Sequence, residues 1–409
     1  MSDIHGKENH QMKHAVRPRR AAAVSALLAA SVALSACGSD DKASTAGAAG
    51  KASDAPASRV TDPIVTTYDG GLYVLDGTTL KLAEDIPLDG FNRVNPAGDD
   101  RHVMVSTATG FRVLDAAGRK LTAVEFEGSK PGHVVRHAGK TILFADGTGV
   151  VTVFDPEDLG GGTKPGTETY TSAAPHHGVA IQLADGKLVT TLGTEEKRVG
   201  IAVLDKERKE ITRSEECPGV HGEAAARGEA VVIGCEDGVL VYKDGAIKKV
   251  KSPAAYGRIG NQAGSEESPV VLGDYKKDKD AELERPEQVS LIDTETGTMR
   301  LVDIGTSYTF RSLARGPHGE ALVLGTDGRI HVIDPTTGKV TRKISALGAW
   351  QEPLDWQQPR PALFVRDHTA YVSDPSSRKL MAIDLESGKQ VASTELPKAP
   401  DELSGVKQH

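Results

Sequence analysis

The sequence predicts an all-β protein, a β-propeller of eight blades, and two observations carry this prediction. Short β-forming runs that end in Asp return every 39 to 50 residues through the body of the chain. Glycine accounts for 44 of the 409 residues, and turn sequences separate the alternating apolar runs. A period of this length that holds about four short strands is typical of a propeller blade. Seven blades plus a strand pair is the alternative.

Eight copies of the repeat mark the blades, and one of the eight is degenerate. The copies are Val74-Leu75-Asp76, Val113-Leu114-Asp115, Val153-Phe154-Asp155, Val203-Leu204-Asp205, Val241-Tyr242-Lys243-Asp244, Leu291-Ile292-Asp293, Val332-Ile333-Asp334 and Ala382-Ile383-Asp384. In the fourth unit, strands are expected at 178–183, 187–192, 200–204 and 210–213, separated by hairpin turns. The first copy lacks an innermost strand, so we expect the C-terminal tail to supply one and close the ring.

The N-terminal segment predicts export and a lipid anchor. Three arginines precede an apolar run over 21–36, which ends in Leu34-Ser35-Ala36-Cys37. A basic region, a short apolar region and small residues at the cut describe a secretory signal peptide. The ending resembles a bacterial lipobox, in which Cys37 becomes the lipidated first residue; an ordinary signal peptide is the alternative. The expected organisation is a lipoprotein signal peptide (1–36), a Ser/Ala/Gly-rich flexible tether (37–58), the propeller (59–400) and a C-terminal tail (401–409).

Charge and hydropathy exclude two classes of protein. The net charge is −8, and removal of residues 1–36, which carry five basic and two acidic side chains, makes it −11. An acidic chain is a poor partner for nucleic acid. No apolar run after residue 37 approaches the roughly 20 residues that span a bilayer, so membrane contact is expected through the lipid alone. We expect an extracytoplasmic monomer.

The two cysteines that remain after Cys37 are expected to pair. Cys217 and Cys235 lie 18 residues apart in a chain predicted to reach an oxidising compartment. An even count in such a compartment indicates a disulfide, which is worth roughly 3 kcal/mol for a loop of this size. The competing interpretation makes Cys217 a thiolate ligand of a metal, four residues before a histidine.

Histidines recur at one phase of three successive repeats. The segments are Pro131-Gly132-His133, Pro175-His176-His177-Gly178 and Cys217-Pro218-Gly219-Val220-His221-Gly222-Glu223. Each opens a repeat, and residues that open consecutive blades lie side by side at one mouth of the central channel. Three imidazoles with a carboxylate or water match the ligand preference of zinc. Of the adjacent pair His176 and His177 one is expected to ligate, and Glu223 is expected to be a ligand or to accept from an imidazole N–H.

The other chemistry-bearing residues are interpreted as structural. His137, His318 and His368 are placed in turns, and His102 and His331 on strands, with His137 kept as a reserve ligand. The carboxylate-rich segment 274–284 does not have the ligand spacing of a calcium loop. No nucleophile elbow, phosphate loop or dinucleotide fingerprint occurs in the sequence, so we expect a protein that is not an enzyme.

The three histidine segments, with Lys130 ahead of the first and Gly234-Cys235 after the third, resemble the AztD-type zinc metallochaperones, as does the repeat body over roughly 60–397. The resemblance implies an extracytoplasmic β-propeller that binds zinc and hands it to the solute-binding protein of a zinc ABC importer. It implies ligands at His133, at His176 or His177, and at His221, and a disulfide between the two matching cysteines. The family is expected to carry a further His/Asp-rich loop in the preceding blade, whereas 107–127 here contain no histidine.

Two other functions compete with this one. A propeller lyase or lactonase would use the same pocket with a divalent metal, although such folds more often set carboxylates and amides around the axis. A metal-free propeller would use the mouth only to dock a protein.

Overall fold

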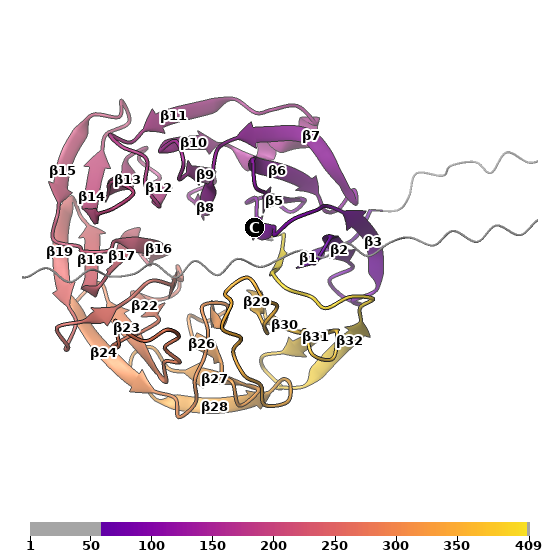
Figure 1. Ribbon diagram of the computed structural model, residues 1–409. Helices are drawn as coiled ribbons and strands as arrows, with labels where there is room; N and C mark the ends of the chain where they lie inside the picture. Colours follow the sequence, from indigo (N-terminus) through magenta and orange to yellow (C-terminus); the bar gives the residue numbers. More distant parts are fainter. Residues whose placement is uncertain (1–58, 407–409) are drawn as a thin grey trace, which may run out of the picture. The chain divides into compact units, whose positions relative to one another are not determined.

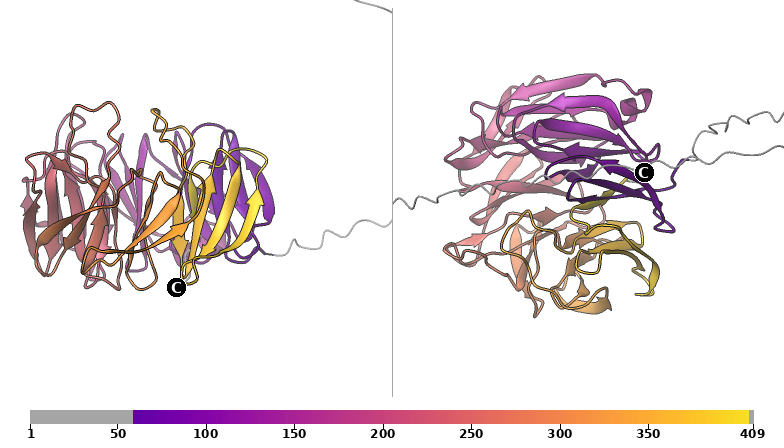
Figure 2. Two further views of the ribbon diagram at one scale, coloured as in Figure 1. Left: turned by 90° about the horizontal axis from the view of Figure 1, so that it is seen from below. Right: turned by 45° about the vertical axis from the view of Figure 1, so that its right-hand side comes forward.

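The computed structural model describes residues 59–406, and the predicted signal peptide, the tether and Cys37 lie outside them. Within the described range, the strands form eight sheets of four antiparallel strands each, one of which has the additional short strand β20 (Gly257–Arg258), arranged around a central channel (Figure 1). The predicted all-β, eight-bladed propeller is therefore confirmed, and the alternative of seven blades is wrong. Seen from the side, loops edge both faces of the disc (Figure 2).

The first four blades are built from strands that follow one another in sequence, except for the innermost strand of blade 1. Their elements are β1 (Ile64–Tyr68), β2 (Gly71–Leu75) and β3 (Leu82–Pro87) with β33 (Leu403–Gly405); β4 (Arg93–Pro96), β5 (His102–Ser106), β6 (Gly110–Asp115) and β7 (Lys120–Glu127); β8 (Pro131–His137), β9 (Lys140–Ala145), β10 (Val150–Phe154), the 3-10 helix η1 (Pro156–Gly161) and β11 (Thr167–Thr171); and β12 (Ala180–Gln182), β13 (Leu188–Gly193), β14 (Arg198–Leu204) and β15 (Glu210–Ser214).

The second four blades continue in the same order around the ring. Their elements are β16 (His221–Ala226), β17 (Ala230–Cys235), β18 (Asp237–Lys243) and β19 (Ala246–Lys251), with β20 (Gly257–Arg258) paired to β18; β21 (Gln262–Ala263), β22 (Val270–Gly273), β23 (Gln288–Asp293) and β24 (Thr298–Asp303); β25 (Leu313–Arg315), β26 (Ala321–Leu324), β27 (Arg329–Ile333) and β28 (Val340–Ser345); and β29 (Leu363–Arg366), β30 (Thr369–Asp374), β31 (Lys379–Asp384) and β32 (Gln390–Glu395).

The ring closes through the C-terminal segment, as the sequence predicts. β33 pairs antiparallel with β1, so blade 1 has the order β3-β2-β1-β33 and combines the two ends of the described chain. Residues 401–406, which were placed in the tail, thus supply the innermost strand. Arg311 fixes the segment that directly precedes β33, because it forms buried ion pairs with Asp401 and Glu402. Closure by strand pairing removes the free sheet edge that an open ring would expose.

The repeated aspartates stabilise the turn between the third and fourth strand of a blade. Asp76 Oδ1 accepts hydrogen bonds from the backbone N–H of Thr78 at 3.2 Å and of Thr79 at 2.8 Å. Asp334 does the same for Thr336 and Thr337, at 2.8 and 3.0 Å. Asp is favoured there because its short carboxylate satisfies turn N–H groups that no strand pairs. This role explains why the motif repeats with the blade.

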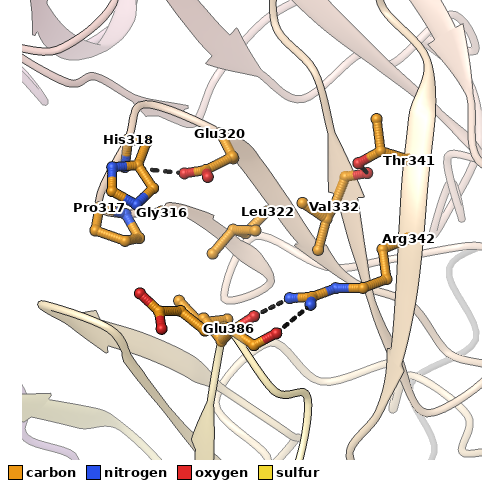
Figure 3. A pocket seen from close by; sticks show the side chains of 10 residues that line it. Gly316, Pro317, His318, Glu320, Leu322, Val332, Thr341, Arg342 and Glu386 are labelled. Atoms are coloured by element: carbon orange, nitrogen blue, oxygen red, sulfur yellow. Dashed lines mark hydrogen bonds between the residues drawn. The ribbon is translucent and has the colours of Figure 1, made fainter.

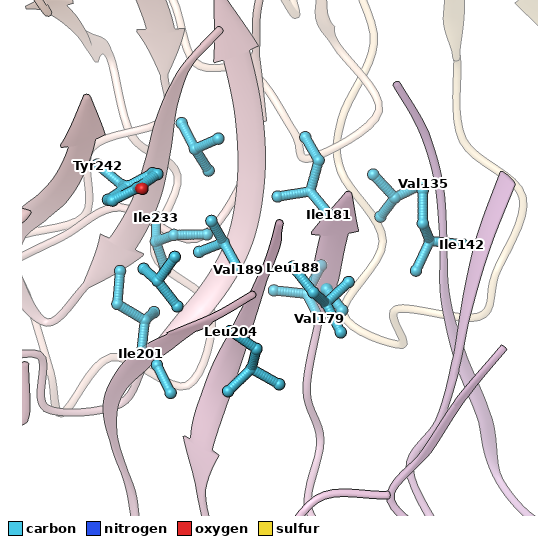
Figure 4. Close-up of a cluster of buried hydrophobic side chains, with 14 of the residues drawn as sticks. Val135, Ile142, Val179, Ile181, Leu188, Val189, Ile201, Leu204, Ile233 and Tyr242 are labelled. Atoms are coloured by element: carbon cyan, nitrogen blue, oxygen red, sulfur yellow. The ribbon is translucent and has the colours of Figure 1, made fainter. Parts of the chain in front are cut away.

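The core lies between neighbouring sheets. In the largest cluster, Val135 and Ile142 of blade 3, Leu188 of blade 4 and Ile233 of blade 5 belong to one continuous apolar layer (Figure 4). Alternate residues of each middle strand face opposite neighbours, which explains why these strands are apolar throughout. Packing of this kind fixes consecutive blades relative to one another, and it fixes the loops at their inner ends as well.

Candidate metal centre

Three imidazoles from three consecutive blades converge at one mouth of the channel. His133 lies in β8, His177 lies just before β12, and His221 opens β16; these innermost strands line the channel side by side (Figure 1). One ring nitrogen of each residue lies within 4.8 Å of the others. The ring centroids are 5.3 Å apart for His133 and His177, 5.4 Å for His133 and His221, and 4.8 Å for His177 and His221. The sequence led us to expect this convergence.

Local irregularities in two strands aim the side chains at the channel. The register of β8 shifts between Pro131 and Val134, and that of β16 shifts between His221 and Glu223. Such bulges re-aim a side chain next to a functional site. Gly222 makes the second bulge possible, because its φ is 70° and a Cβ there would lie 2.5 Å from the Gly260 carbonyl oxygen. Only glycine allows so close an approach.

The hydrogen bonds behind two of the rings fix their tautomers. His177 Nδ1 lies 2.5 Å from Asp146 Oδ2, and His221 Nδ1 lies 2.6 Å from the carbonyl oxygen of Gly260. A carboxylate and a carbonyl only accept, so Nδ1 donates in both residues. Each Nε2 therefore carries its lone pair into the site. The outer partner of an imidazole commonly orients a metal ligand in this way.

The two Nε2 atoms face each other at 2.9 Å. With both Nδ1 protonated, two neutral rings would direct lone pair against lone pair, which is repulsive. Either a proton or a cation between them relieves the repulsion. Burial lowers the pKa of His221 well below its usual value, and the neighbouring His133 and His177 lower it further. His221 is therefore neutral at pH 7 and in the form that binds a metal ion.

Glu223 lies at the edge of this group. Its Oε2 is 3.5 Å from Nδ1 of His133, and it does not belong to the set of mutually close ligand atoms. The side chain is positioned to accept from the imidazole or to swing into the coordination sphere of a bound ion. Both roles were expected from its place two residues after His221.

His176 is separated from the cluster by its own hydrogen bonds. Its Nδ1 lies 2.9 Å from the carbonyl oxygen of Ala174, and its Nε2 lies 2.9 Å from Oγ1 of Thr191. Both nitrogens therefore have protein partners, and the side chain is buried. Desolvation by burial lowers the pKa of this imidazole. Of the adjacent pair, the geometry selects His177 for the site and gives His176 the task of anchoring the loop.

The disulfide predicted between Cys217 and Cys235 is present, which excludes Cys217 as a thiolate ligand. It joins the loop that leads to His221 with the end of β17, the strand to which His221 pairs. The cross-link therefore restrains the backbone on both sides of the histidine.

Two partners of the site had no clear signal in the sequence. Asp146 occupies the turn between β9 and β10, where Asp-Gly is ordinary turn chemistry, so its contact with His177 of the next blade could not be read from spacing. Gly260 contributes only its carbonyl oxygen, which carries no side-chain signal. His137, the reserve ligand, pairs instead with Glu229 at 2.9 Å.

The pocket around the histidines measures about 620 Å³ and is not lined by histidines alone. Arg93, Arg258 and Lys276 contribute positive charge to its lining, and Phe310 and Trp356 contribute aromatic surface. The site therefore offers three metal-ligating nitrogens next to groups that attract an anion or a carboxylate.

Comparison with known proteins finds similarity to a curated zinc chaperone. Zinc chaperone AztD of Citrobacter koseri is 26% identical over 303 residues, which cover 72% of this chain and 69% of that protein. The predicted resemblance to AztD is confirmed. The relative is named a chaperone rather than an enzyme, in agreement with the non-enzymatic role expected here. No protein-family model matches the chain.

Solved structures agree at the level of the fold. Apo AztD from Citrobacter koseri superposes with a TM-score of 0.73 at 22% identity, covering 85% of this chain and 98% of that one. The dihydro-heme d1 dehydrogenase NirN superposes with a TM-score of 0.57 at 14% identity, covering 84% of this chain and 75% of that one. Since a chaperone and a dehydrogenase share the architecture, the fold alone does not decide the function.

Proposed function

We propose that this protein is an extracytoplasmic zinc chaperone, which binds Zn²⁺ through His133, His177 and His221 and delivers it to the solute-binding protein of a zinc ABC importer. The observation that carries the proposal is the approach of His177 Nε2 and His221 Nε2 to 2.9 Å, while the Nδ1 atoms of the same rings are bonded to Asp146 and to the carbonyl of Gly260. The similarity to AztD supports zinc as the cargo.

The geometry suits Zn²⁺ after a small rearrangement of the three side chains. Tetrahedral zinc holds imidazole nitrogens at about 2.0–2.1 Å, which places pairs of ligand nitrogens about 3.4 Å apart. The three histidines start within 4.8 Å of one another, with one pair already closer than the ideal separation. The fourth position is left to Glu223, to water or to a ligand from another protein.

Release of the ion is favoured by an uneven exposure of the ligands. The side chain of His177 is 44% exposed, whereas that of His133 is 23% exposed and His221 lies deeper. An incoming ligand therefore reaches the ion from the side of His177 and replaces this imidazole first. Stepwise exchange lets the ion move to an acceptor without passing through water as the free ion.

The same mouth offers contact surface to a protein acceptor. Trp356 lines the pocket and is 52% exposed, and the nearby Leu354 is 64% exposed. Exposed apolar groups beside a functional pocket are typical of a protein-binding surface.

A lipid on Cys37 with the tether 37–58 would keep this mouth near an importer in the same membrane, with no other membrane contact. Among residues 59–406, no helix is long and apolar enough to span a bilayer.

The proposal is tested by zinc binding and zinc transfer. We expect purified protein to bind zinc at pH 7.5, and His221→Ala to lower the affinity by at least two orders of magnitude. The matched control is His137→Gln, which replaces a histidine of blade 3 outside the cluster. Affinity should fall on acidification to pH 5.5, because protons compete with the metal for the imidazole nitrogens, and the lowered pKa of His221 moves its share of this fall to more acidic pH.

Transfer to an acceptor is measured separately, with the zinc-free solute-binding protein and a chelator that traps free zinc. Zinc should reach the acceptor faster than the loaded protein releases free zinc to the chelator in the absence of the acceptor. Equal zinc affinity of wild type and His221→Ala would overturn the zinc site. Unchanged acceptor binding after His133→Ala and His221→Ala, together with no zinc transfer by the wild-type protein, would favour a metal-free docking propeller. Metal-dependent hydrolysis or elimination would favour an enzyme.

A further inference from the structure

A second group of potential metal ligands lies on the opposite face of the propeller. His318 and His368 follow the ends of the innermost strands β25 and β29, whereas the histidines of the first site lie at the beginnings of such strands. Glu386 lies between β31 and β32, whose connection reaches the same face. Two neighbouring blades, 7 and 8, thus bring two imidazoles and one carboxylate together.

The three side chains are close enough to share one ion. One ligand atom of each lies within 4.8 Å of the others. The rings of His318 and His368 are 5.5 Å apart between centroids, and Nδ1 of His368 lies 3.1 Å from Oε1 of Glu386. Both histidines were assigned to structural turns on sequence grounds, because nothing in the spacing shows that the turns of blades 7 and 8 meet.

The turns that carry these residues are held by backbone hydrogen bonds. In the His318 turn, the N–H of Gly316 donates to the carbonyl of Glu320 at 2.9 Å, and the N–H of His318 donates to the Glu320 carboxylate at 3.0 Å. The carbonyl of His368 accepts from the N–H of Leu385 at 2.8 Å, which ties its turn to the one that holds Glu386. The backbone of the cluster is therefore positioned before any ion binds.

The carboxylate of Glu386 is not neutralised by the nearby arginine. Arg342 donates to the backbone carbonyl oxygens of Leu385 and Glu386. Figure 3 shows the Glu386 carboxylate on the side of the His318 ring, away from the guanidinium. His318, Arg342 and Glu386 line a pocket of about 380 Å³. A bound ion would thus keep the negative ligand and have open positions for water.

We propose that His318, His368 and Glu386 form a second divalent transition-metal site, which cross-links blades 7 and 8 on the face opposite the first site. Two imidazoles and one carboxylate form a donor set that suits Zn²⁺, Co²⁺ and Ni²⁺ rather than Ca²⁺ or Mg²⁺. The side chains of His368 and Glu386 are 46% and 69% exposed, so binding must order them and is weaker than at the first site. This site does not depend on the zinc-chaperone function.

The experiment uses the full chain with the first site removed by His177→Ala and His221→Ala, and Co²⁺ and Zn²⁺ as probes. We expect this background protein to bind Co²⁺ with a visible absorption band and to gain thermal stability with Zn²⁺, because an ion that binds only the folded state stabilises it. Adding His318→Gln and His368→Gln should lower the stoichiometry by one equivalent and abolish both effects. Glu386→Gln alone should weaken binding about tenfold or more.

The matched control is His137→Gln in the same background, which alters the corresponding turn of blade 3 and should leave the stoichiometry unchanged. An unchanged stoichiometry in the His318→Gln, His368→Gln protein, with its circular dichroism spectrum intact, would overturn the proposal. So would Glu386→Gln with undiminished Co²⁺ affinity, a test that leaves both turn histidines in place.

Discussion

At the scale of single residues, the hydrogen-bond acceptors of the Nδ1 atoms determine which imidazole nitrogens are free to bind a cation in the first site. Asp146 holds the Nδ1 proton of His177 and so directs Nε2 toward His221. A carboxylate in this position also raises the basicity of the ring. We expect Asp146→Ala to weaken zinc binding about 10- to 100-fold, because His177 then rotates and changes tautomer freely. Competition against a zinc chelator measures the affinity.

Asp185→Ala is the control for that variant, since Asp185 is an exposed turn carboxylate of blade 4 whose ion-pair partner is Lys187. An Asp146→Ala protein with the affinity of wild type would show that the tautomer of His177 is set by something other than this contact.

Two buried carboxylates of blade 2 predict how stability depends on pH. Burial opposes ionisation of Asp99 and Asp115, but hydrogen bonds from His102 to Asp99 and from Arg101 to Asp115 outweigh it, so both pKa values lie below their usual range. A lowered folded-state pKa contributes stability above the unfolded pKa of about 3.9, and this contribution is lost as the pH falls through the folded value.

We therefore expect the melting temperature to decline from pH 7 to 5, because the lowered pKa values of the buried His176 and His221 cost stability below the ordinary imidazole range, and to fall further below about pH 4 as the two carboxylates become protonated. Asp115→Asn removes the charge-assisted contacts with Arg101, at 2.8 and 2.6 Å, and should cost about 2 kcal/mol at pH 7. Circular dichroism melts of both proteins at pH 7 and pH 3 measure the effect. A variant that loses as much stability on acidification as wild type would contradict the assignment to Asp115.

At the scale of elements, the loop between β28 and β29 combines a rigid base with an exposed tip. Arg360 and Glu352 form a buried ion pair at 2.8 Å, and Arg360 also lies over the Phe310 ring. Trp356 packs on Phe91 with ring centroids 5.2 Å apart and remains half exposed at the pocket that the histidines also line. An exposed aromatic residue on a rigid loop is typical of a hot spot in a protein–protein interface.

Trp356→Ala should slow zinc transfer to the acceptor about tenfold or more and leave the zinc affinity unchanged, because the tryptophan contacts a partner rather than the ion. Stopped-flow transfer and equilibrium titration separate the two quantities. Val391→Ala is the control, since Val391 is exposed on β32, away from the pocket residues. Equal losses in affinity and transfer would place Trp356 in the metal site instead.

The disulfide acts on the element that carries His221. Replacing Cys217 and Cys235 by serine should lower the free energy of unfolding by roughly 3 kcal/mol, because the unfolded chain is no longer constrained. We also expect a weaker zinc affinity, since the loop before β16 is then free to move. Denaturant unfolding and zinc titration of Cys217→Ser/Cys235→Ser measure both effects. Unchanged zinc binding would confine the disulfide to stability.

The same elements show which parts of the fold and of the first site can be predicted from the sequence. The aspartate repeat predicts the blades because each copy stabilises the same turn, and the phase of the histidines predicts that they meet. The outer partners Asp146 and Gly260 escape such reasoning, because contacts between the turn of one blade and the strand of the next depend on packing and bulges. His318 and His368 escape it for the same reason: they lie in equivalent turns, and only the stacking of blades 7 and 8 shows that the turns touch.

At the scale of the whole molecule, the ring depends on β33. This strand pairs with β1 through Ile64, Val65 and Thr66, and Arg311 would lose two buried anionic partners without the segment that leads to it. A buried charge left without its partner costs about 3–5 kcal/mol. The open edge of β1 adds unpaired backbone groups to this cost.

Deletion of residues 401–409 should therefore lower the free energy of unfolding by on the order of 5 kcal/mol and promote association through the exposed edge of β1. Deletion of 407–409 alone is the control and should leave stability unchanged. Denaturant melts followed by tryptophan fluorescence and size-exclusion chromatography measure the two effects. Zinc titration of the 401–409 deletion separates a local effect at the closure from a loss of the whole fold, because blades 3 to 5, which carry the first site, lie away from the closure. A monomeric 401–409 deletion of wild-type stability would show that the propeller is held by packing between blades and not by the strand that joins its ends.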